Sequence, residues 1–196
     1  DVIPVTMQGI VVTIDGYVVI GLRQGFIQNG KISAIPLGYV DAPKIEAIGN
    51  PIFDQFYIES EEELGIEKDH YKHVELIGYQ TDPEFTKGIN FVVRGLTKLS
   101  KKEVTEIRSS TFTIYSEAHE RILAQTSNKS LARKAGQDSV TAAGYKNVDI
   151  GDHNPMIFLP ENNDIMMKII RKRRVEHENN SALLMALTRG ALSIHS

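Results

Sequence analysis

Three glutamates near the middle of the chain have the type and the spacing that would let them bind a divalent cation. They are Glu59, Glu62 and Glu63. On an ideal helix, at about 100° per residue, their carboxylates share an arc of about 100°, and Glu61 points away from them. Carboxylate oxygens are the ligands that Mg²⁺ and Mn²⁺ prefer, and these ions usually bind substrate phosphates as well.

The same helix carries a core-facing stripe directly beside the carboxylates. This stripe holds Phe53, Phe56, Tyr57, Ser60 and Leu64. The glutamates therefore flank the buried edge of the helix, where other elements can close over them. Like charges four residues apart repel by roughly a few tenths of a kcal/mol, and a bound dication would turn this repulsion into attraction. The alternative is a solvated acidic helix end, because charge runs are usually solvated faces.

The helix has clear boundaries in the sequence. Asn50 is a good N-cap, and Pro51 fits the first helical position, where its missing N–H would be unpaired in any case. Gly65 is a natural C-terminal stop. We therefore predict a helix over residues 51–64, with all three glutamates in its second half.

Strand-like segments lie on both sides of this helix in the sequence. Asp15-Gly16 is a strong two-residue hairpin signal between two strand-like runs. Pro36-Leu37-Gly38 ends the next candidate strand, and we expect a loop over residues 39–50. The predicted strands are residues 5–14, 17–22, 31–37, 72–79, 90–97 and 155–159.

Helical patterns dominate the second half of the chain. Ser100 and Glu103 fit a capping box for a short helix that ends near Arg108. Further helices are predicted at residues 117–124, 130–137, 163–173 and 180–194. Strands and helices do not alternate regularly, which disfavours a doubly wound parallel sheet. We predict an α/β chain of the α+β kind, with a mixed β-sheet sandwiched between α-helices. Residues 1–196 would form a single domain with additional C-terminal helices.

The composition excludes several classes of protein. The 196 residues include 22 Lys and Arg against 25 Asp and Glu, and this net charge of −3 argues against general nucleic-acid binding. The absence of Cys rules out thiol catalysis and Cys-ligated metal sites. No apolar run approaches the roughly 20 residues of a membrane helix, and no signal sequence is visible. We therefore expect a cytoplasmic protein without a membrane or nucleic-acid partner.

The segment around the glutamates resembles the C-terminal half of the Nudix box. That box reads G-x5-E-x7-R-E-U-x-E-E-x-G-U, where U is an apolar residue. The matching positions in this chain are Glu59, Glu62, Glu63, Gly65 and Ile66. The strand endings Gly21-Leu22-Arg23 and Pro36-Leu37-Gly38 also resemble those that precede the box in the family. The detailed resemblance covers residues 5–97.

The chain departs from the box at several positions. Ile58 stands where the family has the arginine that helps to orient the glutamates. If Gly38 is the glycine of the box, the loop before Ile58 is six residues longer than in the family. The first glutamate of the box is replaced by Asn50, and Asp41 or Glu46 from the loop are candidates to substitute for it.

The resemblance implies a Mg²⁺-dependent (or Mn²⁺-dependent) Nudix hydrolase. Such an enzyme would cleave the pyrophosphate bond of a nucleoside diphosphate linked to another moiety, for example a nucleotide-sugar or ADP-ribose. Glu59, Glu62 and Glu63 would be its catalytic and metal-binding residues. Arg23, a fork-shaped donor for phosphate, and Gly38 would bind the substrate.

The resemblance also suggests candidates for the general base, a homodimer and an alternative function. In the family the base often lies outside the box, and Glu117 and Glu120 are candidates. A homodimer is common in the family, although the sequence carries no interface signal. The alternative function is a catalytically weakened Nudix-like module that binds a nucleotide or a protein. Ile58 and Asn50 favour this module, whereas the intact set of three glutamates favours hydrolysis.

Overall fold

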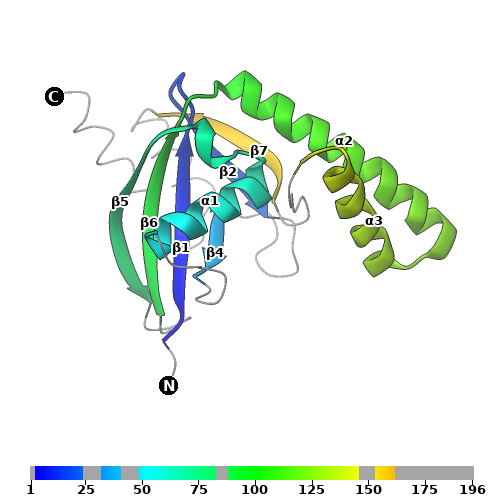
Figure 1. Ribbon diagram of the computed structural model, residues 1–196, viewed down its shortest axis with the longest axis horizontal. Coiled ribbons are helices and arrows are strands. Elements are labelled where there is room, and N and C mark those ends of the chain that lie inside the picture. Colours follow the sequence, from blue (N-terminus) through cyan, green and yellow to red (C-terminus); the bar gives the residue numbers. More distant parts are fainter. Residues whose placement is uncertain (1–2, 24–31, 41–48, 83–87, 146–152, 162–196) are drawn as a thin grey trace.

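The computed structural model describes residues 3–23, 32–40, 49–82, 88–145 and 153–161. Within these ranges the chain forms a seven-stranded sheet, three α-helices and one short 3₁₀ helix (Figure 1). In chain order the elements are β1 (Val5–Val12), β2 (Tyr17–Arg23), β3 (Ile32–Ala34), β4 (Leu37–Tyr39), α1 (Pro51–Leu64), η2 (Lys68–His70), β5 (Tyr71–Asp82), β6 (Gly88–Thr97), α2 (Lys101–Thr126), α3 (Lys129–Ala142) and β7 (His153–Pro160).

Strand β1 lies at the centre of the sheet and is paired along both of its edges. One edge pairs in parallel with β6 over the whole strand, from Val5 opposite Ile89 to Val12 opposite Leu96. The other edge is divided, because its C-terminal part pairs with β2 and its N-terminal part pairs with β4. β5 pairs with β6, and β3 and β7 pair with β2, all antiparallel. The sheet is therefore mixed, as predicted.

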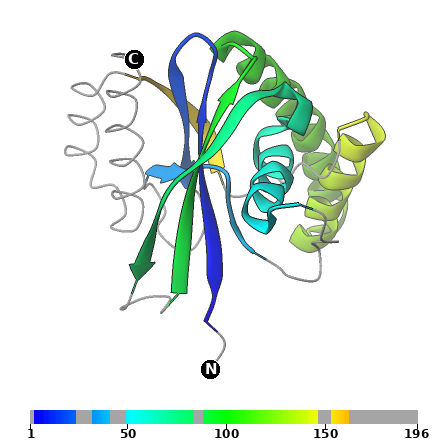
Figure 2. The same ribbon diagram turned by 60° about the vertical axis from the view of Figure 1, so that its left-hand side comes forward.

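The described helices lie on one side of the sheet (Figure 2). Helix α1 packs against β1, β4 and β6, whereas α2 and α3 pack chiefly against each other. This arrangement confirms the α+β class. The helices predicted at 163–173 and 180–194 lie outside the described residues. None of the helices in the described ranges combines the length and the hydrophobicity that a bilayer crossing requires.

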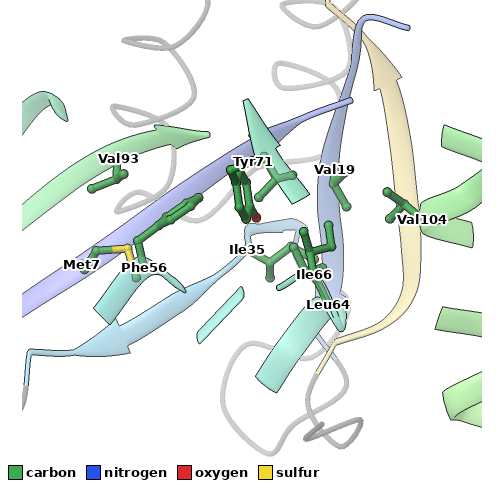
Figure 3. Close-up of a cluster of buried hydrophobic side chains, with 10 residues drawn as sticks. Met7, Val19, Ile35, Phe56, Leu64, Ile66, Tyr71, Val93 and Val104 are labelled. Carbon is green, nitrogen blue, oxygen red and sulfur yellow. The ribbon is translucent and has the colours of Figure 1, made fainter. Parts of the chain in front are cut away.

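A cluster of buried apolar side chains holds α1 against the sheet (Figure 3). Its central contact joins Phe56 of α1 to Tyr71 of β5, whose rings meet edge-on with centroids 5.1 Å apart. The cluster contains Met7, Val11, Val19, Ile35, Phe56, Leu64, Ile66, Tyr71, Val93 and Val104. Because burial of apolar surface is the main stabilising term in folding, this cluster decides which side of α1 faces the sheet.

The strand predicted at residues 31–37 is wrong, because this segment forms two strands with different partners. β3 pairs with β2, and after two buried residues, Ile35 and Pro36, β4 pairs with β1. The Pro36 carbonyl accepts a hydrogen bond from the Gly9 N–H at 2.6 Å. This bond holds the chain to β1 at the point where it passes from one neighbour to the other.

The helix predicted at residues 100–108 is too short, because α2 continues without a break to Thr126 and includes the separate helix predicted at 117–124. The predicted capping box of Ser100 and Glu103 is confirmed at its start. Threonines lower the helix propensity in the middle, but their hydroxyls donate to backbone carbonyls one turn earlier, as at Thr111 and Thr113. Packing against α3 then sustains the helix, and α3 itself is longer than the predicted 130–137.

Candidate functional site

Helix α1 begins and ends at the predicted residues. The Asn50 side chain accepts a hydrogen bond from the Ile52 N–H at 3.0 Å, and Pro51 occupies the first turn. Gly65 follows the helix with a left-handed backbone, φ 71°, and its N–H donates to the Glu61 carbonyl at 3.0 Å. These two caps place the three glutamates in the second half of the helix.

The core flank of α1, which consists of Phe56, Ser60 and Leu64, fixes the rotation of the helix about its axis. All three side chains are buried. The Ser60 hydroxyl is hydrogen-bonded to the Tyr71 hydroxyl inside the core. Burial raises the pKa of Tyr71 above its usual value, so this phenol stays neutral. With this flank fixed on the sheet, the neighbouring side of α1 is directed towards β4.

That neighbouring side carries the acidic flank, which consists of Glu59, Glu62 and Glu63. Glu59 is held between its own helix and β4. The Gln55 amide, one turn earlier, donates from Nε2 to Glu59 Oε1 at 2.7 Å. On the β4 side, a Cβ atom at Gly38 would lie only 2.0 Å from the same carboxylate oxygen. Glycine at position 38 therefore leaves the space in which the Glu59 carboxylate lies.

Glu63 reaches the same strand. Its Oε2 accepts a hydrogen bond from the Leu37 backbone N–H at 3.1 Å, and a backbone donor of this kind favours an ionised carboxylate. Glu62 is partly buried on the same flank. The spacing predicted that the glutamates share one side of the helix, and in the structure Glu59 and Glu63 both contact β4.

The donors of the acidic flank suit a hard divalent cation. They are carboxylate oxygens, which Mg²⁺ and Mn²⁺ prefer over nitrogen or sulfur. Across residues 3–161, apart from the gaps in the described ranges, no group of three or more His, Asp or Glu side chains is placed to hold a metal ion. The type of donor thus fits the cation, and the ligand roles of the three glutamates remain a prediction.

Comparison with known proteins identifies the fold. No protein-family model and no curated protein matches the sequence. The Nudix domain of Shewanella oneidensis NrtR, solved with ADP ribose, matches with a TM-score of 0.51 and 10% identity over 98% of this chain and 90% of that one. A Nudix hydrolase from Nitrosomonas europaea matches with a TM-score of 0.50 and 11% identity over 94% and 88%. The chain has the Nudix fold. At these identities the likeness extends to the fold alone.

Two departures from the Nudix box have a structural account. Asn50, at the position of the first glutamate of the box, serves as the N-cap of α1. Ile58, at the position of the arginine, is partly buried, and the hydrogen bond to Glu59 comes instead from Gln55. The Nudix fold therefore occurs here with a helix cap at position 50 and an apolar residue at position 58.

For the other predicted site residues, Arg23, Glu117 and Glu120, the structure describes no contact with the acidic flank. Arg23 is the last residue of β2, opposite His153 of β7, and its side chain lies outside what the structure describes. Glu117 and Glu120 are exposed on α2. Among the described contacts, no hydrogen bond or ion pair joins these two glutamates to the acidic flank. Their role as a general base stays a prediction.

Two groups that hold the acidic flank were not predicted from the sequence. Gln55 lies four residues before Glu59, a spacing at which side chains on a helix contact each other, so the sequence did carry a signal for it. The Leu37 N–H had no such signal, because a backbone donor reaches Glu63 only once β4 is placed beside α1.

Proposed function

We propose that the chain is a Mg²⁺-dependent Nudix hydrolase that cleaves the pyrophosphate bond of a nucleoside diphosphate linked to another moiety. The observation that carries this proposal is the placement of Glu59 and Glu63 against β4 beside Gly38, in a chain with the Nudix fold. The Shewanella domain was solved with ADP ribose, and we extend this class of ligand to the present chain. Mn²⁺ is the alternative cation.

The carboxylates of Glu59, Glu62 and Glu63 would hold the cation. Such a cation would neutralise phosphate charge and lower the pKa of the attacking water. The Gln55 amide and the Leu37 N–H donate to Glu59 and Glu63, and such bonds favour the ionised carboxylates that a cation requires.

The other parts of the proposed reaction are binding of the substrate phosphates, attack by water and transfer of its proton. Arg23, at the end of β2, would bind a substrate phosphate through two parallel N–H donors. One water adds across the anhydride: a P–O bond forms at one phosphorus, the bridging P–O bond breaks, and each product leaves with a phosphate. A carboxylate would take the proton of the water, and Glu117 and Glu120 are our candidates for this base.

A panel of substrates tests the proposed activity. The protein is incubated with Mg²⁺ and with nucleotide-sugars, ADP-ribose or dinucleoside polyphosphates, and the products are separated by chromatography. We expect cleavage of at least one compound, with loss of activity when the divalent ion is chelated. Absence of turnover for every compound would contradict the proposal.

The first prediction concerns Glu62. Glu62→Gln should lower metal-dependent turnover on the order of 100-fold or more, because a neutral amide replaces an anionic cation ligand, and the melting temperature should hardly change. The matched control is Glu61→Gln, which makes the same chemical change one position away on the helix, and its turnover should stay near that of the wild type. Equal turnover of the wild type and Glu62→Gln would refute the ligand role.

A binding module is the second candidate. It is favoured by Asn50 and Ile58, which replace two residues of the box, because Asn50 is engaged as a helix cap. In that case one compound of the panel would bind tightly in calorimetry without being cleaved at any Mg²⁺ concentration.

A further inference from the structure

Gln55 is a buried polar side chain beside the acidic flank. Only 2% of its surface is exposed, although it lies one turn before Glu59 on the same helix. Burial of an amide costs free energy unless hydrogen bonds replace those to water. The identity of residue 55 therefore requires a reason other than core packing, for which Leu or Met would serve better.

The amide makes one short bond, and that bond goes to Glu59. The Nε2–Oε1 distance of 2.7 Å is at the short end of the range for N–H···O hydrogen bonds. The bond also settles which way the amide faces, because its oxygen and a carboxylate oxygen would both be acceptors. The amide oxygen of Gln55 is buried without a hydrogen-bond partner in the described part of the chain. The unpaired oxygen lowers the stability of the fold, whereas the Nε2 group of the same side chain binds Glu59.

The Glu59 carboxylate is confined from two elements. Gln55 holds Oε1 from α1, and the backbone of Gly38 in β4 passes so close that a Cβ atom would lie 2.0 Å from that same oxygen. Because a hydrogen-bond donor lies on one side of this carboxylate and the β4 backbone on the other, its side chain has few accessible rotamers. Preorganisation of this kind lowers the entropic cost of binding a ligand.

Building on the proposed function, we infer that Gln55 is a positioning residue for Glu59. Ile58, where the box has arginine, offers no hydrogen-bond donor in its side chain, and Gln55 supplies one from one turn further back. The amide differs from an arginine in carrying no charge. It therefore orients Glu59 without adding a positive charge beside the carboxylate.

Direct Mn²⁺ binding to the full chain, measured without substrate by electron paramagnetic resonance, tests the effect on the cation. Gln55→Met keeps the size of the side chain and removes the donor, and the affinity should fall by about 10- to 100-fold, as is typical when the partner of a metal ligand is lost. The matched control is Gln8→Met, the same change at a buried glutamine of β1 that bonds to Asn90. Its Mn²⁺ affinity should equal that of the wild type.

A double-mutant cycle separates positioning from a general effect on the fold. Gln55→Met should cost little further Mn²⁺ affinity in a Glu59→Gln background, because its effect passes through the ionised Glu59 carboxylate. Provided that the wild type binds Mn²⁺, an equal loss in both backgrounds, or no loss in the wild-type background, overturns the inference.

Crystal structures of the wild type and of Gln55→Met, grown without divalent cations, test the positioning itself. The Glu59 carboxylate should leave its place beside Gly38 in the variant. A carboxylate that stays there overturns the inference, whatever the metal affinity. If it moves but the wild type binds no Mn²⁺, the positioning role stands and the proposed metal-dependent function fails.

Discussion

The two flanks of α1 differ in the contacts that their side chains make. On the core flank, Phe56 is fully buried among apolar residues and the Ser60 hydroxyl is matched by that of Tyr71. On the acidic flank, like charges lie one turn apart, and Glu59 and Glu63 are held by an amide and a backbone N–H. One side of the helix is thus held by apolar packing, and the side next to it carries charged groups held by polar contacts. Substitutions on the core flank should change the free energy of unfolding, and those on the acidic flank should change function.

The largest effect on stability is expected at Phe56. Phe56→Ala should lower the free energy of unfolding by about 3–5 kcal/mol, because it leaves a cavity between α1 and the sheet. Chemical denaturation of the purified protein measures this difference. Phe56→Leu, which retains most of the volume, should cost much less. A loss below about 1 kcal/mol for Phe56→Ala would show that this flank does not secure the helix.

A smaller effect is expected at the buried hydroxyl pair. Ser60→Ala should cost about 1–3 kcal/mol, because the Tyr71 hydroxyl loses its partner in the core. Tyr71→Phe should cost a similar amount. The double variant should cost less than the sum of the two, since neither group is then left unpaired, and denaturation curves of all four proteins give the coupling. Strict additivity would argue against the bond.

The smallest effect on stability, with a clear effect on function, is expected at Gly38. In Gly38→Ala the new methyl group meets the end of the flexible Glu59 side chain, so the carboxylate should move while the backbone stays. The free energy of unfolding should change by no more than about 1 kcal/mol, because alanine also restricts the unfolded chain.

Turnover by Gly38→Ala should fall by about 10-fold or more, since Glu59 leaves its place. The control is Tyr39→Ala in the same strand, where the side chain is 67% exposed, and its turnover should be unchanged. A stability loss at Gly38 as large as that at Phe56, or full turnover, would remove the distinction between the flanks.

The elements with local signals were predictable from the sequence. The cap at Asn50 and the stop at Gly65 depend on chemistry within a few residues, and α1 has the predicted bounds. The hairpin at Asp15-Gly16 joins β1 and β2 for the same reason. The division of residues 31–37 into β3 and β4 was not predictable, because β3 pairs with β2 whereas β4 pairs with β1. The full length of α2 likewise depends on α3, which comes later in the chain.

The candidate site was predictable in part. Helical spacing placed Glu59 and Glu63 on one side of α1, and the structure agrees. The spacing said nothing of what holds them, because the Leu37 N–H and Gly38 belong to an element 20 or more residues earlier in the sequence. Gln55 was missed because a glutamine on a helix is usually exposed, and only the packing of α1 on the sheet buries it.

The anchoring of β4 has a consequence for how this chain tolerates insertions. β4 is aligned by its own ladder with β1, where Met7 is opposite Gly38, and α1 is seated independently by its core flank. The connection from Val40 to Gly49 therefore does not set the distance between Gly38 and Glu59. We therefore expect that residues inserted between Val40 and Gly49 leave Gly38 and Glu59 at the same spacing.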